Sequence, residues 1–189
     1  MFEHIEPFSG WLHIYDPAQD RRSPFYGVEH NQFFFDRYIY TYQAHPLWEY
    51  IESESLLVKL LYVNYRRGFA VIELLGEWND LFQNDFKLLC EHCLYPLMKK
   101  GVNRFALITE NVFQLYLQSD EYYRDLQDRL EDGWVALVNA RPNVVDELRR
   151  LDLLDCFHLL TDSREVRWRK QKPWELYYQV TGQPKLQDK

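Results

Sequence analysis

The sequence predicts an α/β fold, with a mixed, mostly parallel sheet of four to five strands and helices packed against it. Over the middle of the chain, short apolar runs typical of buried strands alternate with segments whose apolar residues recur every three or four positions, as in helices. The 189 residues, 47% of them hydrophobic and 17% aromatic, are enough for one substantial core and too few for two ordinary domains. We therefore expect one α/β domain with extensions at both ends.

The middle region opens with a predicted β-hairpin. Residues 55–65 (SLLVKLLYVNY) are apolar on both alternating faces, as in a strand that is covered on both sides. Arg66, Arg67 and Gly68 then provide a tight reversal into a second strand at residues 69–76 (FAVIELLG). The two strands should pair antiparallel.

A first helix is predicted after the hairpin. Asn79 or Asp80 can cap its start, its apolar residues recur at spacings of four and three, and Gly101 ends it. Pro96 should kink this helix or end its last turn early, because proline lacks a backbone N–H. The cysteines of CEHC at residues 90–93 fall mid-helix without a second ligand pair, so we expect small core residues rather than a zinc or redox site.

The remaining elements alternate between strands and helices. In order they are a strand at residues 104–110, a helix from Ser119 to Gly133, a strand at residues 134–140, a helix opening at Pro142 and a strand at residues 156–160. Such alternation implies right-handed crossovers and parallel strands, with one antiparallel pair at the hairpin.

Two flanking regions, residues 1–54 and 161–189, enclose this α/β domain of residues 55–160. The first is rich in aromatic residues and prolines, so we expect irregular structure with one or two short strands, favoured at residues 32–43. So many aromatic side chains should wrap onto the domain. The second is a basic and aromatic arm that should pack on the domain or on a second subunit.

Charge and cysteine content narrow the function classes. A formal net charge of -7 argues against general affinity for nucleic acid or anionic lipid and favours a basic partner. The basic and aromatic stretch at residues 164–172 could bind single-stranded nucleic acid, but it is one short patch on an acidic protein. No apolar run is long enough for a membrane span and the first ten residues do not resemble a secretion signal, so we expect a protein that is neither inserted nor exported. An odd count of three cysteines favours a reducing cytoplasm.

Two stretches resemble the STAS domain, the fold of bacterial anti-sigma-factor antagonists and of sulfate-transporter cytoplasmic domains. The turn GEWND at residues 76–80 is similar to that family's Gly-Glu-Leu-Asp turn before its first helix, and residues 133–160 resemble its closing strand, turn, short helix and final strand. The resemblance covers about residues 55–160 and implies a STAS-like fold and a regulatory, partner-binding role. The antagonists' phosphorylated Ser or Thr lies in a short glycine-containing loop, whereas residues 109–119 are longer and lack glycine, so that site is not carried over.

The acidic segment at residues 120–132 (DEYYRDLQDRLED) is the first candidate site. It carries six carboxylates against two arginines, and in STAS-like proteins the corresponding loop and helix face the partner. It can be an ordinary solvated helix face, or a docking surface for a basic protein in which aromatic residues act as anchors. The candidate partner-binding residues are Tyr116, Ser119, Asp120, Tyr122, Asp125 and Asp128.

The carboxyl ends of the parallel strands form the second candidate site, because ligands of open α/β sheets gather at that edge. The residues expected there could hold a divalent cation through oxygen ligands, or pair an acid with a base, but they can equally be helix caps and turn residues. They are Glu77, Asp80, Glu110, Asn139 and Arg141.

No nucleophile elbow or glycine-rich phosphate loop occurs, and no cofactor is predicted. The leading hypothesis is therefore a non-enzymatic, STAS-like interaction module. The alternatives are an enzyme or small-ligand binder that uses the strand-end carboxylates, and a structural homo-oligomer.

Overall fold

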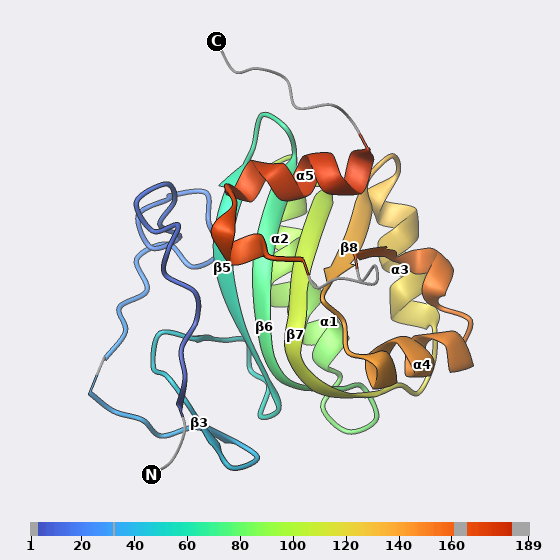
Figure 1. Ribbon diagram of the computed structural model, residues 1–189, viewed down its shortest axis with the longest axis horizontal. Helices are drawn as coiled ribbons and strands as arrows, with labels where there is room; N and C mark the ends of the chain where they lie inside the picture. Colours follow the sequence, from blue (N-terminus) through green and yellow to red (C-terminus); the bar gives the residue numbers. More distant parts are fainter. Residues whose placement is uncertain (1–3, 32, 161–165, 183–189) are drawn as a thin grey trace.

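The computed structural model describes residues 4–31, 33–160 and 166–182, and within them it has the predicted α/β architecture. Six strands form the main sheet and three short strands form a second one (Figure 1). The main sheet has the order β4 (Glu49–Tyr50), β5 (Leu56–Asn64), β6 (Phe69–Asn79), β7 (Arg104–Tyr116), β8 (Trp134–Val138) and β9 (His158–Leu160). The small sheet consists of β1 (His4–Ile5), β3 (Tyr42–Ala44) and β2 (Tyr38–Ile39).

The main sheet is mixed and mostly parallel. Strands β6 to β9 pair in parallel, while β4 with β5 and β5 with β6 are the antiparallel pairs of this sheet within the described residues. The sheet thus has one strand and one antiparallel pair more than predicted. Both come from β4, which belongs to the region before residue 55 and is too short, at two residues, to show a periodicity.

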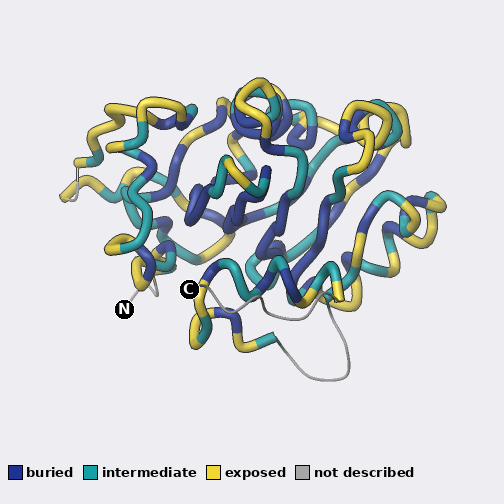
Figure 2. The backbone as a smooth tube through the Cα atoms, turned by 90° about the horizontal axis from the view of Figure 1, so that it is seen from above, coloured by how far each residue is buried: buried dark blue, intermediate teal, exposed yellow. Residues whose placement is uncertain are grey.

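Four helical segments cover one face of this sheet. They are α1 (Asp85–Leu89), which continues through a π-helical turn at Cys90–Leu94 into α2 (Tyr95–Met98), then α3 (Glu121–Leu130) and α4 (Pro142–Arg150). All follow from right-handed crossovers between parallel strands, which place consecutive helices on the same side. Their inner residues join the largest core cluster, while their outer residues are exposed (Figure 2).

The first helix begins later than predicted and changes form before its proline. The N-cap position is held by Asn84, but the Asp80 carboxylate accepts a hydrogen bond from the N–H of Phe86 in the first turn of α1, and the Asn79 side chain accepts one from the Phe82 N–H. Both therefore shape the loop that leads into α1. Pro96 is the second residue of α2, just after the π-helical turn, and the wider turn accommodates the residue that cannot donate the regular hydrogen bond.

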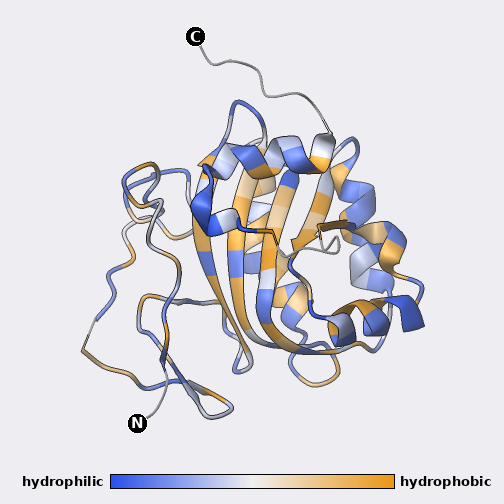
Figure 3. Cartoon of the chain, viewed as in Figure 1, coloured by the Kyte–Doolittle hydropathy of each residue, from blue (hydrophilic) through white to orange (hydrophobic). Residues whose placement is uncertain are grey.

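The two flanking regions meet on the opposite face of the sheet. Trp11 from the first region and Trp168 from the arm are 4% and 1% exposed, and their rings lie 5.6 Å apart. Helix α5 (Pro173–Thr181) crosses the sheet beside them, and the Trp11 indole N–H donates to the Gln171 carbonyl at 3.0 Å. Both faces of the apolar strands are thus covered, as the two-sided hydrophobic pattern of residues 55–65 predicts (Figure 3).

Strands β6 and β7 run further than the sequence predicts. They remain paired through Asn79 and Tyr116, across two register shifts, because Val112 and Leu115 are buried beyond the predicted end of the strand. Gly76 permits the close passage of β5, since a Cβ there would lie 2.1 Å from the Ser55 carbonyl oxygen. The expectation of a loop at residues 109–119 is therefore wrong over most of its length.

The aromatic stretch at residues 32–43 is not one strand. It contains β2 and the start of β3, which pair antiparallel around Tyr40, whose φ of 54° reverses the chain. Residue 32 lies outside the described residues. The alternation of aromatic residues indicates β-structure correctly but does not show the turn.

Candidate functional site

The outer face of α3 carries the residues predicted to bind a partner. Tyr116, at the end of β7, is 37% exposed, and Tyr122 in the first turn of α3 is 39% exposed. Ser119, Asp120 and Asp128 are exposed as well. The helix turns its other side inward, where Leu126 and Leu130 join the core.

Tyr123 shows why the two adjacent tyrosines of this helix differ. Its ring is buried and stacks on Phe86 with centroids 4.1 Å apart, and its hydroxyl donates to the Asp80 carboxylate. Tyr123 is therefore part of the core, and Tyr122 is the aromatic side chain available on the outside.

The arginines of α3 are occupied by acidic neighbours. Arg124 pairs with Asp155 at 2.6 Å and with Asp120 at 3.6 Å, and Arg129 pairs with Asp125 at 2.7 Å. Arg129 lowers the pKa of Asp125, which also accepts a hydrogen bond from the Tyr95 hydroxyl. Asp125 is thus half-buried and engaged, and is the least available of the predicted contact residues.

Several carboxylates on the same face have no counter-ion. Among the described residues, no Lys, Arg or His nitrogen lies within 4.0 Å of the side chains of Glu121, Asp128, Glu131 or Asp132. Glu121 and Asp128 belong to α3 together with the exposed Tyr122, Glu131 and Asp132 follow the end of the helix, and Tyr116 precedes its start, so this part of the chain is negatively charged and carries two exposed aromatic side chains.

The second predicted site is divided between the two faces of the sheet. Asp80 lies on the helical side, where it is bound by Phe86 and Tyr123, and burial raises its pKa. Glu110 and Asn139 lie on the other side, under the arm, with 3.3 Å between the Asn139 amide nitrogen and the Glu110 carboxylate. The structure brings these last two together and places Asp80 away from them.

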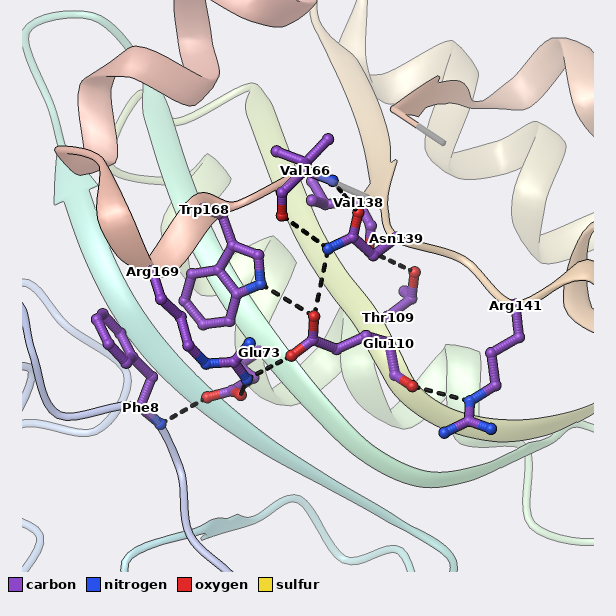
Figure 4. Close-up of polar contacts among 10 residues, drawn as sticks. All are labelled: Phe8, Glu73, Thr109, Glu110, Val138, Asn139, Arg141, Val166, Trp168 and Arg169. Atoms are coloured by element: carbon purple, nitrogen blue, oxygen red, sulfur yellow. Dashed lines mark hydrogen bonds and ion pairs between the residues drawn. The ribbon is translucent and has the colours of Figure 1, made fainter. Parts of the chain in front are cut away.

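Glu110 anchors the arm, as Figure 4 shows. Its carboxylate forms an ion pair with Arg169 and accepts a hydrogen bond from the Trp168 indole at 3.1 Å. Although burial opposes it, hydrogen bonding by Arg169 and Trp168 lowers the pKa of Glu110. Arg141 binds the backbone carbonyl of Glu110 at 2.8 Å, not the carboxylate that could have paired with it. Glu110 is in mid-strand because β7 continues to Tyr116.

Glu73, which the sequence reading passed over, lies in the same cluster. It is 1% exposed on β6, accepts a hydrogen bond from the Phe8 N–H at 2.8 Å and lies 3.5 Å from Arg169. Burial is the main reason that the pKa of Glu73 rises to about 7, with the Glu110 charge adding to it and Phe8 and Arg169 opposing it. A single acidic residue inside the apolar run FAVIELLG is the signal that points to it.

A second buried charged group, also passed over, joins β4 to β5. Lys59 is 8% exposed and contacts the Glu49 carboxylate at 3.0 Å, and the His30 ring nitrogen lies 3.1 Å from the same oxygen. The Lys59 ammonium also donates to the Leu47 carbonyl at 2.9 Å. A lysine within SLLVKLLYVNY is again the sequence signal.

Comparison with known proteins shows a distant likeness to anti-sigma-factor antagonists. The anti-sigma factor antagonist SpoIIAA in its unphosphorylated form is similar with a TM-score of 0.47 and 17% identity, over 68% of this chain and 99% of that chain. The Bacillus cell fate determinant SpoIIAA in its phosphorylated form is similar with a TM-score of 0.41 and 16% identity, over 65% and 98%. No protein-family model and no curated protein matches the chain.

The described residues contain neither a cluster of metal-binding side chains nor a helix that could span a membrane. No group of three or more His, Cys, Asp or Glu side chains in them could hold a metal ion, and Cys90 and Cys93 are buried core residues. None of the helices in these residues is both long enough and apolar enough to cross a membrane.

Proposed function

We propose that this chain is a non-enzymatic, regulatory interaction module that binds a basic protein through the outer face of α3 and the end of β7. The observation that carries the proposal is the group of unpaired carboxylates on α3 together with the exposed rings of Tyr116 and Tyr122. Aromatic anchors surrounded by charged groups are typical of protein interfaces, where the charges steer the partner and the rings supply most of the binding energy.

The geometry of the strand ends favours this function over a small-ligand site. The polar atoms of Asp80, Glu110 and Asn139 are bound by other groups of the chain, and the clusters lie on opposite sides of the sheet. By contrast, the carboxylates of Glu121 and Asp128 point to no cation of the described chain. The proposal includes the bacterial cytoplasm as its setting, in line with three cysteines that form no disulfide.

The test compares two variants with the same change of charge. Glu121→Gln/Asp128→Asn removes two unpaired charges from α3, whereas Glu52→Gln/Glu91→Gln removes two from exposed positions near the first helix. Proteins captured from a native extract by the parent chain are identified, and the principal one is purified and titrated against each variant. We expect at least about tenfold weaker binding for the α3 variant, and a smaller change for the control.

Tyr122→Ala should add a loss of about 2 kcal/mol, with the circular dichroism spectrum unchanged because the ring is outside the core. Equal binding by the parent, the α3 variant and Tyr122→Ala would refute the proposed surface.

A further inference from the structure

A small pocket opens where the N-terminal region meets the hairpin. Its volume is about 200 Å³, and it is lined by two tyrosines, two glutamates, one serine and one isoleucine: Tyr38, Ile39, Tyr40, Glu54, Ser55 and Glu77. Of these, Tyr38 and Tyr40 are more than half exposed, while Ile39 is 6% exposed and belongs to a core cluster. Aromatic rings and carboxylates therefore surround an apolar base.

The two glutamates of the pocket form no ion pair within the described residues, although the Tyr50 hydroxyl donates to the Glu54 carboxylate at 3.4 Å. No Lys, Arg or His nitrogen among the described residues lies within 4.0 Å of the Glu54 or Glu77 carboxylates, and the nearby Arg37 stacks on the Tyr50 ring at 3.7 Å. Behind the pocket, the Ser55 hydroxyl donates to the buried carboxylate of Asp85 at 2.7 Å.

The aromatic wall lies close to these charges and to β7. Burial raises the pKa of Tyr40, and the neighbouring Glu77 carboxylate raises it further. The Tyr40 ring meets the Phe113 ring edge-on with centroids 5.8 Å apart, and Glu77 is in register with Gln114, so the pocket lies beside β7. Tyr40 holds its position with a φ of 54°, a conformation that is rare for a large side chain.

We infer that this pocket binds a cationic side chain of the partner, and that arginine is its preferred occupant. A planar guanidinium can stack on Tyr38 or Tyr40 while it donates hydrogen bonds to Glu54 and Glu77, and the pocket has room for one side chain. Lysine has the charge but not the planar group, so it should bind more weakly. The inference rests on the proposed function for the source of the arginine, and its chemistry can be tested without the partner.

The test uses the peptide acetyl-Gly-Arg-Gly-amide and its citrulline counterpart, which has nearly the same shape without the charge. Two-dimensional ¹⁵N spectra of the full chain are followed up to about 10 mM peptide, a range suited to weak single-side-chain binding. The arginine peptide should shift the amides of residues 38–40, 54–55 and 77 in a saturable way, and the citrulline peptide should bind at least roughly tenfold more weakly.

Three variants locate the effect. Glu54→Gln/Glu77→Gln should weaken arginine binding by roughly tenfold. Glu121→Gln/Asp128→Asn, with the same change of charge on α3, should leave it within about twofold of the parent. Tyr40→Asn removes the ring but keeps a residue that tolerates the left-handed conformation, and it should weaken binding by about threefold to tenfold.

Equal binding of the arginine and citrulline peptides, absence of saturable shifts at the pocket, or full binding by Glu54→Gln/Glu77→Gln would each overturn the inference. If Tyr40→Asn fails to fold, the result for Glu54→Gln/Glu77→Gln decides whether the inference holds, because both of its positions are outside the core. If the α3 variants lose partner capture but the arginine peptide does not bind the pocket, this inference fails and the proposed function stands. If the peptide binds the pocket but the α3 variants capture the partner normally, the proposed function fails and the chemistry of the pocket stands.

Discussion

Glu73→Gln should remove a pH dependence from the stability of the protein and make it more stable at neutral pH. In the folded chain, burial raises the pKa of this carboxyl from an ordinary 4.5 to about 7, so the folded state holds the proton more tightly than the unfolded state. The protonated form is therefore the favoured one in the fold. The contribution of Glu73 to the free energy of unfolding should therefore be greatest below pH 4.5 and should be lost as the pH rises to about 7.

The size of the effect follows from the shift. A difference of about 2.5 pKa units corresponds to about 3 kcal/mol, at ~1.4 kcal/mol for each unit. Glutamine has no charge at any pH, and its side-chain oxygen can still accept the hydrogen bond from the Phe8 N–H. The loss of attraction to Arg169, 3.5 Å away, offsets part of the gain, so we expect about 1–3 kcal/mol of stabilisation at pH 8 and little change at pH 5.

Urea unfolding of the parent and Glu73→Gln at intervals from pH 4.5 to 8 measures this difference directly. Histidines titrate in the same range, but they contribute equally to both proteins and cancel in the difference. Glu110→Gln is the matched control, for which we expect the opposite change in the free energy of unfolding at pH 8. Its pKa is lowered by Arg169 and Trp168, so Glu110 stabilises the fold above pH 4.5, and its removal should destabilise the protein at pH 8. Parallel curves for the parent and Glu73→Gln would refute the reasoning.

Two further predictions concern the arm and the thiols. Trp168→Ala should cost about 3–5 kcal/mol in urea unfolding and speed tryptic cleavage within the arm, whereas Trp174→Ala, at a half-buried position, should cost clearly less; equal costs would contradict the arm's anchoring. Burial raises the pKa of Cys90 and Cys93 well above the usual range, so Ellman's reagent should label Cys156 alone in the native protein and all three thiols after denaturation. Rapid native labelling of three thiols would contradict this packing.

The order of strands and helices can be predicted from the sequence because its signals are local. The apolar runs, the turn at Gly68, the proline that opens α4 and the acidic start of α3 all act within a few residues. These features set the α/β class and the parallel order with no knowledge of long-range contacts. The same locality explains why the exposed side of α3 could be anticipated, since a helical pattern separates its inner and outer faces.

The rest depends on contacts between distant segments. Glu110 looks like a strand-end residue until the pairing of β7 with β6 extends the strand to Tyr116. Its partners in the structure, Trp168 and Arg169, are 58 and 59 residues further along the chain, and no local sequence pattern predicts these contacts. The buried charges of Glu73 and Lys59 stand out within apolar runs, yet only the folded chain shows what binds them.

The coverage of the sheet explains why recognition should depend on side chains at α3 and at the ends of β6 and β7. Helices occupy one face, and described parts of the two flanking regions, with Trp11, Trp168 and Leu176, pack on the other. Within the described residues the edge strands β4 and β9 are two and three residues long, so neither offers the extended backbone that an added strand would need. On the proposed function, the partner would therefore contact charged and aromatic side chains, which we place at the outer face of α3 and at the pocket beside Tyr40.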